Sequence, residues 1–226
     1  MNAVHIPLVI QFVKRQIVAM GIAERKQRHK TDLRDKVLKV SQKIMLNEGL
    51  SALTIRRVAD EIEYSPGAIY LYFRNREEIV RELGRLGMET LLEYLQRGDV
   101  ATDPAERLGV MALNYARFAS EHTETYRLVF MSDSETARAV FGNGDGKNAK
   151  AGPGERAFHM LVHEFTRLRG SHADFAELDP IRVAEIYWAH LHGIASLKIS
   201  CSEFLNTPVE VLVETSVKVL LAGIKS

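Results

Sequence analysis

The sequence predicts an all-α protein built from an N-terminal three-helix unit and a larger helical domain. Two observations predict this fold class. Apolar residues recur at intervals of three and four along almost every segment, and the alternation typical of strands is absent. The 226 residues are 46% hydrophobic and 26% charged, which is enough apolar side chain to bury a core. We expect an N-terminal extension over residues 1–30, a small domain over 31–80 and a helical domain over 81–226.

The small domain is expected to begin with a helix from Asp32 to Glu48, which Gly49 ends. A second helix is expected from Thr54 to Ile62, with Thr54 as its N-cap. The buried stripe of the first helix is predicted to consist of Val37, Leu38, Ser41, Ile44 and Met45.

A short third helix is expected from Pro66 to Phe73, since a proline at the first helical position needs no N–H partner. The fourth helix is expected to start at Asn75 and to reach about Gln96. Asn75 and Glu78 have the spacing of a capping box, in which two side chains satisfy the free N–H groups at a helix start.

The larger domain shows the same helical period, interrupted by capping residues and a polar loop. Asp179-Pro180 and Thr207-Pro208 each place a capping residue before a proline in the first turn. The loop is expected over residues 141–153. The helices are expected at about residues 104–121, 123–131 with a continuation over 134–140, 154–169, 179–200 and 207–225.

Charge is unevenly distributed, although the formal net charge is only +1. Residues 1–58 carry 12 Lys and Arg against 4 Asp and Glu, whereas residues 99–226 carry 13 against 17. A basic N-terminal third indicates either a polyanion-binding head or an ordinary solvated basic surface. The single cysteine, Cys201, excludes a disulfide framework and a Cys-rich zinc site, and it favours an intracellular compartment.

The most apolar stretch of the chain, residues 3–22, is not expected to cross a membrane. Pro7 and the Lys14-Arg15 pair interrupt it, and it falls short of the ~20 apolar residues that a span requires. It also lacks the order of a secretory signal, in which the charge precedes the apolar run. We therefore expect a cytoplasmic protein, and we hypothesise that translation starts at Met20.

Residues 54–73, TIRRVADEIEYSPGAIYLYF, have the pattern of two short helices meeting steeply over a shared core. Ala59 is small enough for the helix that starts at Pro66 to approach closely, and Ser65 can cap that helix after the turn. An exposed helix N-terminus attracts phosphate through its free N–H groups. The residues spaced to face the shared core are Val58, Ile62, Tyr64, Ile69 and Phe73.

Residues 33–83 resemble the DNA-binding domain of the TetR (tetracycline-repressor) family of bacterial transcription regulators. The resemblance rests on Tyr70-x-x-Phe73, on the Asn75-Arg-Glu-Glu78 helix start and on the string between Thr54 and Glu78. Glu63 stands where the family usually has a turn glycine. A positive φ there would cost ~1 kcal/mol.

The resemblance implies that the second and third helices contact double-stranded DNA. A basic arm upstream is expected to reach a minor groove. The alternatives are a core tyrosine at position 70, intramolecular packing of Tyr72 and a solvated arginine face. The implied DNA-binding residues are Thr54, Arg56, Ser65, Pro66, Gly67, Ala68, Tyr70, Leu71, Tyr72 and Arg76, with Arg28 and Lys30 in the arm.

The segment Tyr187-Trp-Ala-His-Leu-His-Gly193 resembles the Trp-His-Gly signature in the C-terminal domain of one TetR subgroup. That resemblance implies a ligand pocket between the middle helices and a homodimer through the last two helices. For the pocket residues and for the dimer residues alike, the alternative is ordinary core packing. The pocket candidates are Phe118, Tyr126, Phe130, Met131, Phe158, Val162, Phe165, Tyr187, Trp188 and Leu191. The dimer candidates are Leu212, Val213, Ser216, Val217 and Leu220.

The expected function is that of a transcriptional repressor, released from an inverted-repeat operator by a largely apolar small molecule. Ligand binding would move the fourth helix and change the separation of the two recognition helices, ideally ~34 Å. One alternative is a DNA-binding protein without a ligand. The other is a helical metal enzyme built on His159 and His163, which share a helix face, although no catalytic residue, metal or cofactor is predicted.

Overall fold

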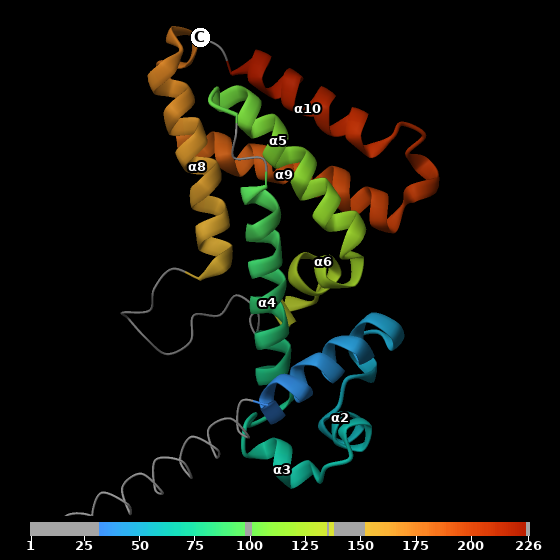
Figure 1. The fold of residues 1–226 in the computed structure, drawn as a ribbon. Coiled ribbons are helices and arrows are strands. Elements are labelled where there is room, and N and C mark those ends of the chain that lie inside the picture. The colour runs from blue at the N-terminus through green and yellow to red at the C-terminus, as the bar shows by residue number, and fades with distance from the viewer. Residues whose placement is uncertain (1–31, 98–100, 135, 138–151, 225–226) are drawn as a thin grey trace, which may run out of the picture. The chain divides into compact units, whose positions relative to one another are not determined.

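The computed structural model describes residues 32–97, 101–134, 136–137 and 152–224 of the chain. The described residues form helices and connecting turns without a strand, which confirms the all-α prediction (Figure 1). The chain divides into two compact units, Met1–Arg76 and Glu77–Ser226, close to the expected boundary at residue 80. No described helix is sufficiently long and apolar to span a bilayer.

The first unit starts, within the described residues, with a helix over residues 32–48, whose predicted apolar stripe is buried. Gly49 follows it with a φ of 84°, a left-handed conformation that favours glycine, so the predicted stop is confirmed. The 3₁₀ helix η1 (Leu50–Ala52) comes next, and sequence analysis did not predict it. Helices α2 (Ile55–Ile62) and α3 (Pro66–Tyr70) complete the unit (Figure 1).

Helices α2 and α3 pack over the predicted core, where Val58, Ile69 and Phe73 are fully buried. Tyr64 was wrongly assigned to this core, because its side chain is 40% exposed. Its neighbour Glu63 has φ 59° and ψ 41°, a left-handed conformation that turns the chain out of the α2 helical path. Tyr64 therefore does not continue the buried face of α2.

Helix α3 ends at Tyr70, three residues before the predicted end at Phe73. The carbonyl oxygen of Ile69 accepts hydrogen bonds from the backbone N–H groups of both Tyr72 (2.8 Å) and Phe73 (3.0 Å). This sharing tightens the last turn and ends the α-helix.

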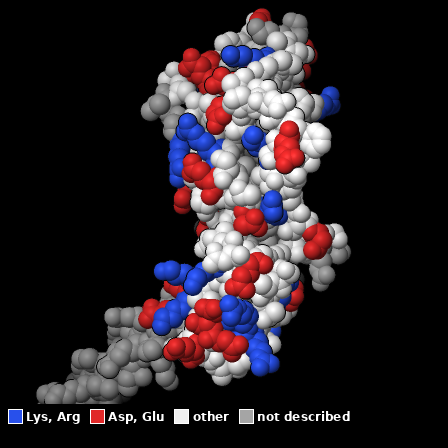
Figure 2. All heavy atoms as spheres, turned by 90° about the vertical axis from the view of Figure 1, so that its right-hand side faces the viewer, with Lys and Arg blue, Asp and Glu red and all other residues white. Residues whose placement is uncertain are grey.

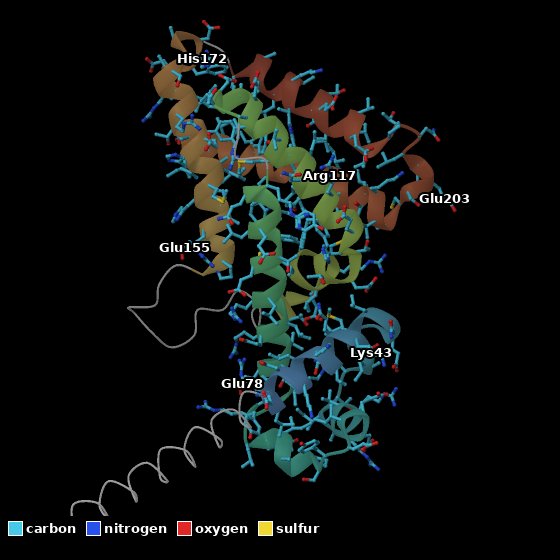
Figure 3. The ribbon with its side chains drawn as sticks, viewed as in Figure 1. Lys43, Glu78, Arg117, Glu155, His172 and Glu203 are labelled. Atoms are coloured by element: carbon cyan, nitrogen blue, oxygen red, sulfur yellow. The ribbon has the colours of Figure 1, made fainter. Side chains whose placement is uncertain are left out.

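The second unit is a bundle in which α10 packs against α5 and α9, and α8 packs against α5 and α9. Its core contains large side chains such as Phe118, Phe165 and Tyr187. The charged side chains of Arg117 and Glu155, labelled in Figure 3, are exposed on α5 and α8. The helices are α4 (Arg76–Gln96), α5 (Pro104–Glu121), α6 (Thr123–Phe130), α8 (Pro153–Ser171), α9 (Pro180–Ser200) and α10 (Val209–Gly223), with 3₁₀ helices η2 (Ala173–Phe175) and η3 (Ser202–Phe204).

The predicted caps of this unit were right at α9 and wrong at α10. Asp179 accepts hydrogen bonds from the N–H groups of Ile181 (3.1 Å) and Arg182 (3.2 Å). Thr207 does not cap α10, because that helix begins two residues later, with Pro208 as its N-cap and without a side-chain cap. Most of the predicted loop and of the helical continuation over 134–140 lies outside the described residues.

Helices α4 and α6 approach each other closely at Gly87. A Cβ atom at this position would lie 2.6 Å from Thr125 Cγ2 and 3.1 Å from Val129 Cγ2. Both distances are shorter than ordinary van der Waals contact. Glycine is therefore required here by packing against α6 rather than by backbone conformation.

Candidate nucleic-acid interface and ligand pocket

The start of α3 is exposed and capped. Ser65 has extended dihedral angles, and its hydroxyl oxygen accepts a hydrogen bond from the Ala68 N–H at 3.3 Å. Pro66 occupies the first turn, and both Pro66 and Gly67 are exposed. The capping role predicted for Ser65 is thus confirmed, and the helix start at Pro66 and Gly67 is exposed to solvent.

The end of α3 and the two residues after it carry large side chains that the fold of this unit does not fully bury. Tyr70 is 55% exposed and Leu71 is 77% exposed, whereas Tyr72 is half-buried. A Cβ atom added at Gly67 would meet only Ser65 Oγ, at 3.7 Å, an ordinary contact. The exposure of Tyr70 disfavours the alternative that it is a core tyrosine, and Gly67 is not required by packing within the unit.

Thr54 is confirmed as the N-cap of α2, since its hydroxyl oxygen accepts a hydrogen bond from the Arg57 N–H at 3.1 Å. The Arg57 guanidinium pairs with Glu48 at 3.1 Å and with Glu61 at 3.0 Å. The hydrogen bond to Glu48 is the main cause of the raised pKa of Arg57. The neighbouring Arg56 has an exposed side chain. We therefore expect Arg56 rather than Arg57 to contact a DNA phosphate.

Arg76, which was predicted to anchor a phosphate, makes two hydrogen bonds within the first unit that sequence analysis did not predict. Its Nε donates to the Leu53 carbonyl oxygen at 2.7 Å, and its Nη2 donates to the Leu50 carbonyl oxygen at 2.9 Å. These carbonyls lie at the two ends of η1, and the Arg76 side chain is partly buried. The guanidinium therefore fixes η1 to the start of α4 within the first unit.

Charge on the described surface does not form one large basic patch on the face that Figure 2 shows, where basic and acidic side chains are interleaved. Arg28 and Lys30, predicted to form the basic arm, lie outside the described residues.

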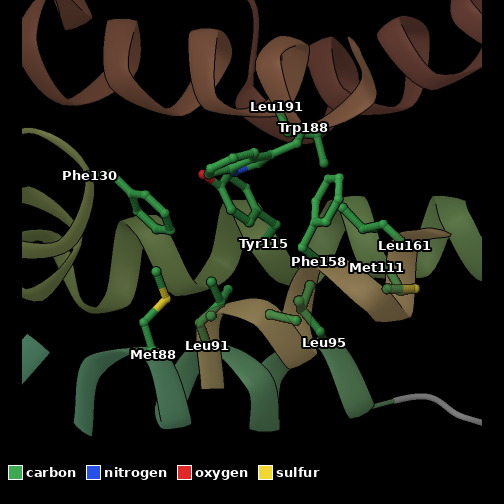
Figure 4. Close-up of a pocket in the computed structure, with 12 residues that line it drawn as sticks. Met88, Leu91, Leu95, Met111, Tyr115, Phe130, Phe158, Leu161, Trp188 and Leu191 are labelled. Carbon is green, nitrogen blue, oxygen red and sulfur yellow. The ribbon is translucent and has the colours of Figure 1, made fainter. Parts of the chain in front are cut away.

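A cavity of about 200 Å³ lies inside the second unit and opens between α4, α5, α8 and α9 (Figure 4). Its lining is almost entirely apolar, with the Tyr115 hydroxyl and the Trp188 indole as its polar groups. The lining residues are Met88, Leu91, Leu95, Met111, Tyr115, Phe130, Gly154, Ala157, Phe158, Leu161, Trp188 and Leu191.

Four predicted pocket residues line this cavity: Phe130, Phe158, Trp188 and Leu191. The others do not. Phe118, Tyr126, Phe165 and Tyr187 are fully buried in the core, Val162 packs against that core, and Met131 is exposed. The aromatic side chains were overestimated as pocket residues, because aromatics on amphipathic helices fill cores as readily as they line cavities.

Sequence analysis missed the wall that α4 contributes, which consists of Met88, Leu91 and Leu95. Their spacing of three and four is the spacing of any buried helix face, so the sequence offered no signal that separates lining from core. Tyr115 was also missed, and it places the hydroxyl group at the cavity wall.

Four side chains form a chain of polar contacts beside the cavity. Trp188 Nε1 lies 3.4 Å from the Tyr115 hydroxyl, which lies 3.1 Å from the Tyr126 hydroxyl. The Tyr126 hydroxyl lies 2.6 Å from His192 Nδ1. Burial raises the pKa of Tyr115 to about 12 and lowers the pKa of His192 below its usual 6.5. Both tyrosines and His192 are therefore neutral at neutral pH.

One direction of donation satisfies every donor in this chain. The Trp188 N–H can only donate, so Tyr115 accepts from it. Tyr115 then donates to Tyr126, and Tyr126 donates to His192 Nδ1. The reverse direction would leave the buried Tyr115 O–H without an acceptor among these groups, which is costly. Tyr115 consequently has no hydroxyl proton left to donate to a ligand in the cavity.

The dimer residues predicted on α10 divide into two groups. Val213, Val217 and Leu220 are buried in the core of their own unit, so their assignment to a dimer surface is corrected. Leu212 and Ser216 are half-buried. The large apolar side chains that are exposed on the last two long helices are Ile181, Ile186, Trp188 and Leu197 on α9 and Val211 and Val219 on α10.

The two histidines considered as metal ligands, His159 and His163, are both exposed on α8. In the part of the chain that the structure describes, no group of three or more His, Cys, Asp or Glu side chains is arranged to hold a metal ion.

Two family models match the chain. Residues 37–83 match the model described as bacterial regulatory proteins, tetR family, and residues 108–221 match the model described as tetracyclin repressor-like, C-terminal domain. The second match alone spans half of the chain. The first of them covers the helix-turn-helix unit, and the second covers most of the unit that holds the cavity.

Among curated relatives, an uncharacterized HTH-type transcriptional regulator of Haemophilus influenzae is 29% identical over 33% of this chain and 40% of its own length. The HTH-type transcriptional repressor KstR2 of Mycolicibacterium smegmatis is 29% identical over 45% of this chain and 50% of its own. The chain thus spans half or less of the length of these two relatives. Among solved structures, FadR from Bacillus subtilis in complex with stearoyl-CoA has a TM-score of 0.64 at 14% identity, covering 84% of this chain and 99% of that one.

Proposed function

This chain belongs to the tetR family of bacterial regulatory proteins, and from that premise we propose that it is a DNA-binding transcriptional repressor released by a small molecule. The observation that carries the proposal is the exposed, capped start of α3, with Tyr70 and Leu71 directed to solvent. A helix presented in this way suits insertion into a DNA major groove. The proposed place of action is the bacterial cytoplasm.

We propose two kinds of DNA contact: contacts to phosphates, which position the protein on the duplex, and contacts to base edges, which recognise sequence. The hydroxyl groups of Thr54, Tyr70 and Tyr72 and the guanidinium of Arg56 are proposed to contact phosphates, which fixes the register without reading sequence. Ser65, Pro66, Gly67, Ala68 and Leu71 are proposed to face the base edges. Arg76 is left out of this set because its donors hold η1.

The ligand is proposed to occupy the cavity of the second unit. A cavity of ~150 Å³ lined by Leu, Ile and Phe binds benzene, so a volume of about 200 Å³ accommodates a compact apolar group somewhat larger than one aromatic ring. The fold neighbour from Bacillus subtilis, solved with stearoyl-CoA, supports a small-molecule site in a domain of this architecture.

Helix α4 is proposed to transmit ligand binding to the DNA-binding unit. It begins at Arg76, in the first unit, and carries Met88, Leu91 and Leu95 along the cavity wall. A ligand that displaces this wall would change the spacing of two recognition helices away from ~34 Å, the separation of successive major grooves. The ligand shifts the equilibrium only by its difference in affinity for the two states.

A homodimer is proposed to form through α9 and α10, using the exposed Ile186, Leu197, Val211 and Val219. Val219→Glu is then expected to give monomers by analytical ultracentrifugation, because it places a charge in the interface without touching the core. Leu46→Glu, on an exposed face of the first unit, is the matched control and should remain dimeric. A dimeric Val219→Glu protein would exclude this surface.

The regulator proposal is tested by selecting bound sequences from a randomised DNA duplex pool and titrating the recovered site at two salt concentrations. A palindromic site, with a salt slope that reports several phosphate contacts, is the expected result. Weak binding without a recovered site, under conditions in which the protein is folded and dimeric, would contradict it.

A further inference from the structure

A second hollow adjoins the cavity and shares two of its walls, Phe130 and Trp188. The two rings meet edge to face, with centroids 5.9 Å apart, and Phe130 lies at the same centroid distance from His192. Figure 4 shows Phe130 and Trp188 among the side chains that line the apolar cavity, and both also line the second hollow. The two spaces are therefore neighbours that share these two side chains.

The polar groups of the second hollow are Ser132, Glu185 and His192. The Ser132 hydroxyl donates its proton to the Leu128 carbonyl oxygen at 2.8 Å, so lone pairs are what it offers to a ligand. Glu185 contributes an exposed carboxylate. His192 Nδ1 is already occupied by the Tyr126 hydroxyl.

The hydroxyl protons of Tyr115 and Ser132 are both donated within the protein, and Glu185 adds a carboxylate, so most polar atoms of the two spaces are hydrogen-bond acceptors. The Nε2–H of His192 is the donor that the hollow offers. Among the described residues that line either space, there is no lysine or arginine. An anionic group placed here would face the Glu185 carboxylate, and none of these described lining residues is a cation that would compensate it.

We infer that the effector is amphipathic, with an apolar body in the cavity and a hydrogen-bond-donating end, neutral or cationic, in the hollow beside Glu185 and Ser132. This inference rests on the proposed function, because it takes the cavity to be the effector site. It adds the chemistry of the ligand's polar end, and it makes Glu185 the residue that discriminates against anions.

The experiment uses three probes with one apolar chain and different ends: octylamine, 1-octanol and octanoate. Trp188 is the single tryptophan of the chain and lines both spaces, so its fluorescence reports binding directly. At neutral pH, octylamine is expected to bind most tightly and octanoate most weakly. In Glu185→Gln, the affinity for octylamine relative to 1-octanol should fall about five-fold, the size of an exposed ion pair.

The control variant is Glu177→Gln, an exposed glutamate that lines neither space, and it should keep the wild-type ratio. Octanoate binding as tightly as octylamine, or a ratio unaffected by Glu185→Gln, would overturn the inference while leaving the cavity as an effector site. No response of Trp188 to any of the three probes would instead contradict the cavity itself, and the inference would fall with it.

Discussion

The guanidinium Nε of Arg76 lies 2.7 Å from the carbonyl oxygen of Leu53 and donates a hydrogen bond to it. Together with the bond from Nη2 to the Leu50 carbonyl, this forked contact closes η1 against the first residue of α4. The fork geometry is specific to arginine, because a lysine ammonium is a single point donor. Arg76 is therefore a structural residue of the DNA-binding unit.

Arg76→Lys and Arg76→Ala are expected to lower the free energy of unfolding by about 1–3 kcal/mol, since each removes charge-assisted hydrogen bonds. Urea denaturation followed by circular dichroism measures this. Arg169→Ala, which removes an exposed arginine on α8, provides the comparison. Unchanged stability of Arg76→Ala, with weakened DNA binding, would return Arg76 to the role of a phosphate anchor.

Gly67→Ala is expected to weaken DNA binding while leaving the stability of the protein nearly unchanged. The added methyl group meets only Ser65 Oγ at 3.7 Å, so the unfolding free energy should change by less than about 1 kcal/mol. In a closely packed protein–DNA interface, the same methyl group should cost about 1–3 kcal/mol. Gly170→Ala on α8, where the added Cβ meets nothing within 4 Å, is the control. Wild-type affinity of Gly67→Ala for the selected site would mean that this end of α3 does not approach the bases.

Tyr70→Ala is expected to weaken binding to specific and unrelated duplexes alike, by ~1–2 kcal/mol, as the loss of a phosphate contact does. Tyr70→Phe removes only the hydroxyl group and should reproduce most of that loss if the contact is a hydrogen bond. Because Tyr70 is 55% exposed, neither variant should change the melting temperature appreciably. A loss confined to one sequence would instead indicate base recognition by this residue.

The stability of the second unit is expected to fall as the pH drops below 6.5. Burial lowers the pKa of His192 in the folded chain, so the unfolded chain binds its proton more readily. The contribution of neutral His192 to the free energy of unfolding is complete above pH 6.5. It is lost as the pH falls from 6.5 through the folded-state pKa of His192. His192→Asn keeps an acceptor for Tyr126 but does not titrate, and the thermal stability of this variant should depend less on pH in that window. Equal slopes for both proteins would exclude His192 as the titrating group.

Gly87→Ala should destabilise the second unit by about 1–3 kcal/mol, because the new Cβ would lie 2.6 Å from Thr125 Cγ2. Thr125→Ser removes that methyl group and should recover much of the loss in the double variant. A double-mutant cycle of denaturant unfolding measures the coupling. Additive effects would mean that the two helices separate freely at this point.

The sequence predicted the helix-turn-helix unit well because its boundaries depend on local chemistry. Ser65 and Thr54 accept hydrogen bonds from N–H groups three residues ahead, and Gly49 adopts a positive φ. Such contacts are encoded within a few residues. Tyr64 was misassigned although the sequence marked Glu63 as the position of a turn glycine, because its helical spacing was followed through a residue that adopts the left-handed conformation.

The cavity was predicted less well because its wall depends on how helices distant in sequence meet. Leu91 and Leu95 have the same spacing whether they face a partner side chain or an empty volume. The apolar stripe of α10 likewise fitted either a dimer surface or a core. Val213 and Val217 are buried in the core of their own unit. Periodicity identifies a buried face but not what covers it.

The glycine contact between α4 and α6 also determines how displacement can travel. At an ordinary contact between two helices, side chains of both helices lie between the backbones. When one helix is displaced, these side chains can change rotamer before the other backbone moves. At Gly87 the α4 backbone has no side chain of its own, so only the Thr125 and Val129 side chains separate the two backbones. Phe130, at the end of α6, lines both the cavity and the adjoining hollow. A displacement of α6 from either space would therefore reach the α4 backbone through fewer side chains than at an ordinary helix contact.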